Sequence, residues 1–221
     1  FPTPLSKNIM NPTIDDLQSF NQKNIINDND CIDLLNILLL LLDQVNNFKQ
    51  ICDIGLELFT KNKENECLKK HLLDTVFSGE DYNVLHYSFC RNLYKNQIMI
   101  TIQDVHQKLE QILAGIHEDK LKPPIGCDFK CIILATPLIF FPNEIQKSYK
   151  KDYVKYCNEI SEIFRKSPMK KRLPPEWKTP LKIRNEIYGL MAGNNTFNPD
   201  DIEKVLKMAG DPSKIPHLKI I

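Results

Sequence analysis

The sequence predicts an all-α fold in which antiparallel helical hairpins pack as an irregular bundle or a short α-solenoid. Apolar residues recur at helical spacing in successive segments, and capping residues, glycine or proline bound most of these segments. The connections between successive segments are short, which favours antiparallel neighbours. Only 7 of the 221 residues are glycine, fewer than a turn-rich β-sandwich would need.

The first predicted helices follow two capping signals. Asn11 and Pro12 are a cap residue and a proline suited to the first helical position, so we expect a short helix to open there. Asp30 is the expected cap of a leucine-rich helix that continues to Leu42. Because apolar residues occur on every face of this second helix, we expect it to lie buried at the centre of the first half.

Four more helices complete the predicted first half of the chain. The last of them opens with Thr101 and Asp104, whose spacing approximates a capping box. The predicted ranges are 48–61, 64–77, 81–95 and 102–116. No residue signature recurs at a fixed period, so the pattern does not indicate a regular repeat family.

The second half begins after a proline-containing break at 121–126. Its first apolar segment, 129–141, contains Pro137 and fits either a kinked buried helix, which we favour, or a short extended segment near 129–136. One long helix is expected over 143–166, and two more are expected after Thr179-Pro180 and Asn198-Pro199. We therefore divide the chain into helical halves, 1–120 and 121–221, that form one continuous domain.

The basic segment, 144–184, contains 12 Lys and Arg against 5 Asp and Glu, although the whole chain has a net charge of +1. It includes the only tryptophan, Trp177, in a proline-rich loop that is stiff enough to limit the entropy lost on binding. The alternative is that Trp177 packs on its own domain. The predicted contact residues are Trp177, Tyr153, Lys170, Lys171, Arg172, Lys178 and Arg184.

These features favour a non-enzymatic adaptor or scaffold domain that binds other proteins in a multiprotein complex. The alternative is a helical domain that binds RNA or DNA through residues 144–184, because lysines and arginines neutralise phosphates and an aromatic ring can stack on a base. The sequence has no glycine-rich phosphate loop, nucleophile elbow or metalloprotease helix, so nothing in it indicates an enzyme.

Two Cys–His pairs are the candidate metal ligands. Cys67 and His71, and likewise His86 and Cys90, are four residues apart on predicted helices, so each pair shares a helix face. If the two helices were antiparallel, the pairs could converge on a zinc ion. Structural zinc sites usually have closer cysteines, however, and core cysteines with satisfied histidines explain the pattern better. We therefore expect no cofactor.

The compartment is predicted from the cysteines and the longest apolar run. The run at 37–42 is far shorter than the roughly 20 residues that span a bilayer. The seven cysteines lie mostly at apolar helix positions, as reduced thiols do, which favours the cytoplasm or the nucleus. The chain begins at Phe1 rather than Met, so we expect an upstream segment. That expectation and a glycosylation sequon at Asn194 keep a secreted helical signalling protein as a further alternative.

Overall fold

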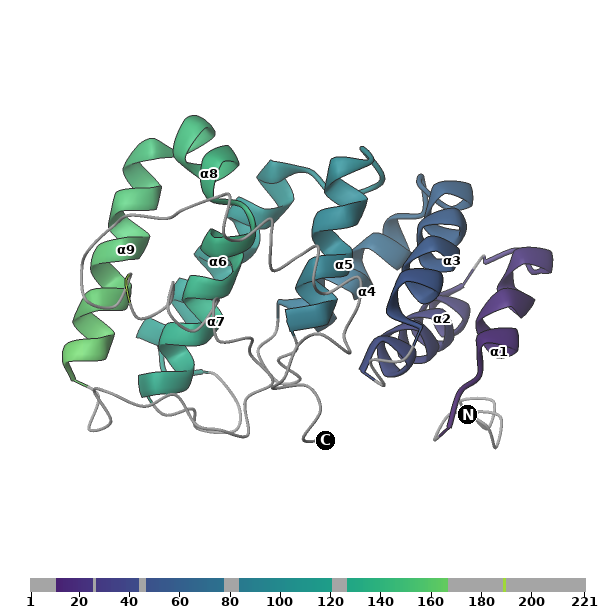
Figure 1. Ribbon diagram of the computed structural model, residues 1–221. Coiled ribbons are helices and arrows are strands. Elements are labelled where there is room, and N and C mark those ends of the chain that lie inside the picture. Colours follow the sequence, from purple (N-terminus) through teal and green to yellow (C-terminus); the bar gives the residue numbers. More distant parts are fainter. Residues whose placement is uncertain are drawn as a thin grey trace.

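The computed structural model describes residues 11–25, 27–43, 47–77, 84–120, 127–166 and 189. All regular secondary structure in these ranges is helical, which confirms the predicted all-α class. Figure 1 shows the helices side by side in an elongated array, from α1 at one end to α8 and α9 at the other. The elements are α1 (Ile14–Gln18), the 3-10 helix η1 (Ser19–Gln22), α2 (Asp28–Asp43), α3 (Phe48–Lys61), α4 (Glu66–Val76), α5 (Val84–Lys95), α6 (Ile102–His117), α7 (Cys127–Phe140), α8 (Pro142–Ser148) and α9 (Lys150–Arg165).

Two capping boxes start helices in this array. At α6 the predicted box is present: Thr101 Oγ1 accepts from the Asp104 amide at 3.2 Å, and Asp104 Oδ2 accepts from the Thr101 amide at 2.8 Å. The same arrangement of Thr13 and Asp16 starts α1, so that helix begins later than the predicted cap at Asn11. Thr13 has the extended backbone that a capping side chain needs in order to reach back to the first turn.

The cap of α2 also differs from the prediction. Asn27 Oδ1 accepts from the Asp30 amide at 2.9 Å, so Asn27 fills the role that we expected of Asp30. Asp30 lies inside the first turn, where a carboxylate complements the helix dipole, and it pairs with Lys23 at 2.5 Å.

The core is organised around α2, as its apolar pattern predicts. Leu34, Leu38 and Leu42 are fully buried. The helix packs against α1, α3, α4 and α5. A helix with neighbours on so many sides needs apolar residues on several faces.

The apolar segment with Pro137 is helical and forms α7, so the extended alternative near 129–136 is not observed at the residues that are described. Every residue from Cys131 to Phe141 is buried. This helix packs against α5, α6, α8 and α9, which joins residues 127–166 to the preceding part of the chain. Its β-branched residues are explained by this enclosure and not by a strand.

The single helix predicted over 143–166 is wrong, because the structure has two helices with a break at Tyr149. The Tyr149 backbone, at φ −134° and ψ 50°, is not helical, although its amide still donates to the Ile145 carbonyl at 2.8 Å. The Tyr149 ring lies flat against His106 of α6. The chain therefore changes direction between α8 and α9.

No helix in the described ranges is both long and apolar enough to cross a membrane. Apart from residue 189, the helices predicted after Thr179-Pro180 and Asn198-Pro199 lie outside the described residues, as does the sequon at Asn194.

Candidate functional site

Of the predicted contact residues, Tyr153 alone lies in the part of the chain that the structure describes. Its side chain is buried, with 5% exposure, on the face of α9 that includes Tyr156 and Ile160. Burial also raises the pKa of its phenol. Tyr153 is therefore a core residue and not an exposed contact, because its helical spacing places it on the apolar face of α9. The other predicted residues lie outside the described ranges: Trp177, Lys170, Lys171, Arg172, Lys178 and Arg184.

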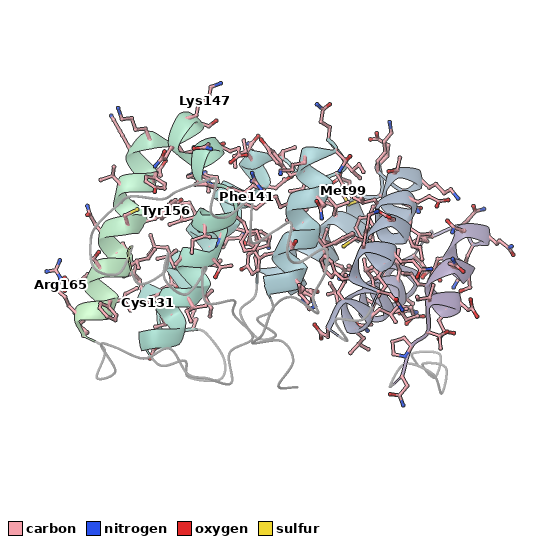
Figure 2. All side chains as sticks on the ribbon, in the orientation of Figure 1. Met99, Cys131, Phe141, Lys147, Tyr156 and Arg165 are labelled. Atoms are coloured by element: carbon pink, nitrogen blue, oxygen red, sulfur yellow. The ribbon has the colours of Figure 1, made fainter. Side chains whose placement is uncertain are left out.

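The described part of the basic segment presents a group of lysines at the junction of α8 and α9. Lys147, Lys150 and Lys151 are exposed, and none of them forms an ion pair with another described residue. Figure 2 shows Lys147 projecting away from the body of the protein at the end of α8. We call these three residues the basic corner.

An exposed apolar side chain lies next to the basic corner. Val154 follows Lys150 and Lys151 by about one turn of α9 and is 48% exposed. In the described ranges, only Ile32 is another large hydrophobic residue with comparable exposure. Lys155 is also exposed but forms an ion pair with Glu110 of α6 at 3.1 Å, so its charge is partly satisfied within the protein.

The corner is attached to α6 by an aromatic stack and by a close contact between His106 and a carboxylate. The rings of His106 and Tyr149 are parallel, with their centroids 3.7 Å apart. His106 Nε2 lies 3.3 Å from Asp152 Oδ2 in the first turn of α9. Tyr149, which breaks the helix, and Asp152, in the first turn of α9, therefore contact the same histidine.

Glu110, one turn beyond His106, adds a second attachment. It accepts a hydrogen bond from the Tyr156 hydroxyl at 2.5 Å and another from Lys155 Nζ at 3.1 Å. The Tyr156 hydrogen bond is the main cause of a lowered pKa for Glu110. Burial, followed by this same hydrogen bond to the carboxylate, raises the pKa of Tyr156.

His106, Glu110, Asp152 and Tyr156 form a polar cluster that the sequence pattern does not reveal as part of the site. His106 and Glu110 are four residues apart on α6, and Asp152 and Tyr156 are four apart on α9. Each spacing places two polar groups on one helix face, which was the available signal. The periodicity of the two helices does not reveal that these faces meet.

The structure does not bring the four predicted zinc ligands together. His86 is buried beside α2, with Nε2 2.7 Å from Asp43 Oδ1 and 3.2 Å from the Leu39 carbonyl oxygen. Cys90 is fully buried, and burial raises the pKa of its thiol. Cys67 and His71 instead lie with Asp28, and the possible ligand atoms of these three residues are within 4.8 Å of one another.

The basic corner is suited to binding and has a defined position. Three ammonium groups beside an apolar side chain can attract an acidic surface and then exclude water from a small contact. The polar cluster beneath the corner sets the direction of α9 relative to α6. Comparison of the chain with protein-family models, with curated proteins and with solved structures finds no match.

Proposed function

We propose that this protein is a non-enzymatic helical adaptor or scaffold domain that binds an acidic surface of a partner protein through the basic corner and Val154. One observation carries the proposal: Lys147, Lys150 and Lys151 are exposed without an ion pair to any other described residue. A surface lysine that is not paired within its own chain remains available to a partner's carboxylates.

Charge and apolar contact have different roles in this proposal. The lysines accelerate encounter and orient the partner, within the Debye length of about 8 Å at physiological ionic strength. Val154 is 48% exposed, and burying the rest of its side chain would contribute about 1 kcal/mol. The charged contribution falls as salt rises, whereas the apolar contribution does not.

The attachment of the corner to α6 favours binding without a large loss of conformational freedom. Tyr149 is stacked on His106, and Tyr156 donates to Glu110. Both contacts exist within the protein alone, so the helices that present the lysines are already positioned. The lysine side chains still lose rotamer freedom when they bind.

Charge reversal tests the proposal. We expect full-length protein to retain specific partner proteins from a source-cell lysate after nuclease treatment, and the variant with Lys147, Lys150 and Lys151 changed to Glu to lose them. The matched control reverses Lys49, Lys63 and Lys70, which are exposed on or beside α3 and α4, and thereby makes an identical change in net charge.

The result depends on which variant loses the partners. Retention by the control and loss by the corner variant would support the proposed surface. Equal recovery with wild-type protein and with the corner variant would refute it. Circular dichroism of both variants checks that the helices are intact, so that unfolding is not mistaken for loss of the surface.

The second candidate function, direct binding of RNA or DNA, is favoured by the same three lysines. If all three contacted phosphates of a duplex, the affinity would fall about 40-fold between 50 and 200 mM salt. Titration of a labelled duplex at both salt concentrations measures this dependence. Nucleic acid in the captured material, together with loss of the proteins after nuclease treatment, would favour this candidate over the adaptor.

A further inference from the structure

Four side chains with metal-binding atoms lie between α2 and α4. Asp28 and Cys31 are three residues apart at the start of α2, and Cys67 and His71 are four apart on α4. Both spacings place the two side chains of a pair on one helix face. Helices α2 and α4 pack against each other, so the two faces can supply one site.

Three of these four groups are in short contact. Cys67 Sγ donates to Asp28 Oδ1 at 2.7 Å, and the possible ligand atoms of Asp28, Cys67 and His71 are all within 4.8 Å of one another. Cys31 lies outside this group of three, although its thiol is close enough to Cys67 for each to affect the pKa of the other. A tetrahedral zinc ion with bonds of about 2.0 to 2.3 Å separates its ligand atoms by about 3.3 to 3.8 Å. Small side-chain movements would bring Asp28, Cys67 and His71 to these separations, and the Cys31 side chain would have to turn toward them to complete the site.

We propose that Asp28, Cys31, Cys67 and His71 bind a structural zinc ion that links α2 to α4. Two thiolates, one imidazole and one carboxylate are ligand types that zinc accepts, and four protein ligands give the closed tetrahedron of a structural site. When zinc binds, the two Zn–S bonds replace the two S–H bonds and both thiol protons go to solvent. His71 coordinates as the neutral imidazole.

The carboxylate of Asp28 and that of Glu110 differ in their cationic partners. At the corner, Glu110 accepts from Lys155 and Tyr156, so its carboxylate has partners within the protein. In the described part of the chain, by contrast, no lysine or arginine forms an ion pair with Asp28. A carboxylate next to two thiols that could ionise is a place where a bound cation stabilises the negative forms.

The surroundings of the two thiols raise their pKa values. Burial and the hydrogen bond to Asp28 are the main causes that raise the pKa of Cys67 to about 12. Burial also raises the pKa of Cys31. Because zinc binds thiolates and displaces the thiol protons, its affinity should increase as pH rises.

The four ligands range from exposed to fully buried, so the site is open to solvent on one side. Cys31 is fully buried, Cys67 and His71 are half-buried, and Asp28 is exposed. A metal ion can thus approach from the Asp28 side and reach the interior thiol last. Asn65, the cap of α4, supports this inner end, because its Oδ1 is 3.8 Å from Cys31 Sγ and its Nδ2 donates to the Ile25 carbonyl at 3.0 Å.

Cobalt titration of the reduced full-length protein tests the proposal, because Co²⁺ reports both geometry and thiolate ligation. We expect one Co²⁺ per chain, visible bands of tetrahedral intensity and a sulfur-to-cobalt charge-transfer band, all removed by added Zn²⁺. Release of about two protons per zinc should accompany binding. Cys31→Ala should halve the charge-transfer intensity per bound cobalt, since one of two thiolates is lost.

A second variant keeps the test valid if replacement of buried Cys31 prevents folding. His71→Gln, at a half-buried position, should retain both thiolates but weaken zinc binding by at least about tenfold, the lower limit for losing even an outer-shell partner. Cys52→Ala and His117→Gln change residues outside the cluster and should match wild type.

Three outcomes would overturn the proposal. The first is a folded wild-type protein without a charge-transfer band. The second is His71→Gln protein that binds zinc as tightly as wild type. The third is a native disulfide between Cys31 and Cys67, detected by mass spectrometry without reduction, because an oxidised pair provides no thiolate.

Discussion

Arg91 connects α5 to the turn between α7 and α8. Replacing it by methionine tests how much this connection contributes to the free energy of unfolding. Its Nη1 donates to the Phe140 carbonyl oxygen and lies 3.4 Å from Glu144 Oε1. The guanidinium also lies 5.6 Å from the centroid of the Phe141 ring. The Arg91 side chain is only 11% exposed, so water cannot fully replace these contacts.

The expected loss of stability follows from these contacts. A hydrogen bond from a charged donor contributes about 1.5 to 3 kcal/mol, and the contact with the Phe141 ring adds about 0.5 to 1. Methionine keeps most of the apolar packing of the arginine stem. Glu144 is 22% exposed and can be hydrated in part, so we add little for its ion pair. Arg91→Met should therefore lower the free energy of unfolding by about 2 to 4 kcal/mol.

Urea denaturation followed by circular dichroism measures this difference. In thermal denaturation, a domain of this size should lose about 2 to 4 °C in Tm for each kcal/mol. Arg165→Met is the matched control, because Arg165 is 73% exposed and pairs with Glu162 on its own helix at 3.5 Å. If Arg91→Met unfolded within about 0.5 kcal/mol of wild type, the scale of surface substitutions, our account of the α7–α8 turn would be wrong.

Three further predictions concern helix packing, capping and pH. In Gly55→Ala, the new Cβ would lie 2.9 Å from the Phe89 ring, so overpacking should outweigh the gain in helix propensity and cost about 1 kcal/mol in urea denaturation. Adding Phe89→Leu should relieve that cost, and strict additivity in the double-mutant cycle would argue against the clash. Thr101→Ala should lower stability by about 1 kcal/mol, whereas Thr101→Ser should restore the cap, and equal thermal denaturation of the two variants would contradict the capping role. The pKa of Glu110 is lower in the native state, so its contribution is complete above the ordinary glutamate pKa and is lost as pH falls through the native value. Glu110→Gln should therefore flatten the loss of stability in acid, measured by urea denaturation at several pH values, and an unchanged acid dependence would remove this assignment.

Helix positions could be predicted where the signals are local. The bounds of α3, Phe48–Lys61, match the predicted range, and the α6 capping box involves residues only three apart. The cap of α2 was misassigned because Asn27 and Asp30 are both good capping residues and lie three apart. Side-chain type alone does not decide which of them has the non-helical backbone.

The break at Tyr149 depends on a partner distant in the sequence. Residues 143–166 have a continuous helical pattern, and the sequence there contains neither glycine nor proline. The stacking contact with His106 of α6 is a tertiary interaction. Periodicity therefore predicts the apolar face of α9 but not the corner at its start.

The partners of Cys67 and His71 also depend on helix packing, which the sequence pattern does not show. The i, i+4 spacing of Cys67 and His71 was recognisable, but α4 packs on α2, which places Asp28 and Cys31 beside them instead of His86 and Cys90. Sequence order suggested that α4 and α5 would pair. Helix α2 has apolar residues on several faces, and both α4 and α5 pack against it.

The enclosure of α2 also explains why its first turn is where ligands can gather. From Leu34 to Leu42 the helix is apolar except for Asn36, and its neighbours bury most of it. Asp28 and Cys31 precede that stretch, at the end of the helix where solvent begins. A metal ion there would join α2 to α4 at the edge of the core, where apolar packing ends. Its binding free energy would stabilise the contact between these two helices.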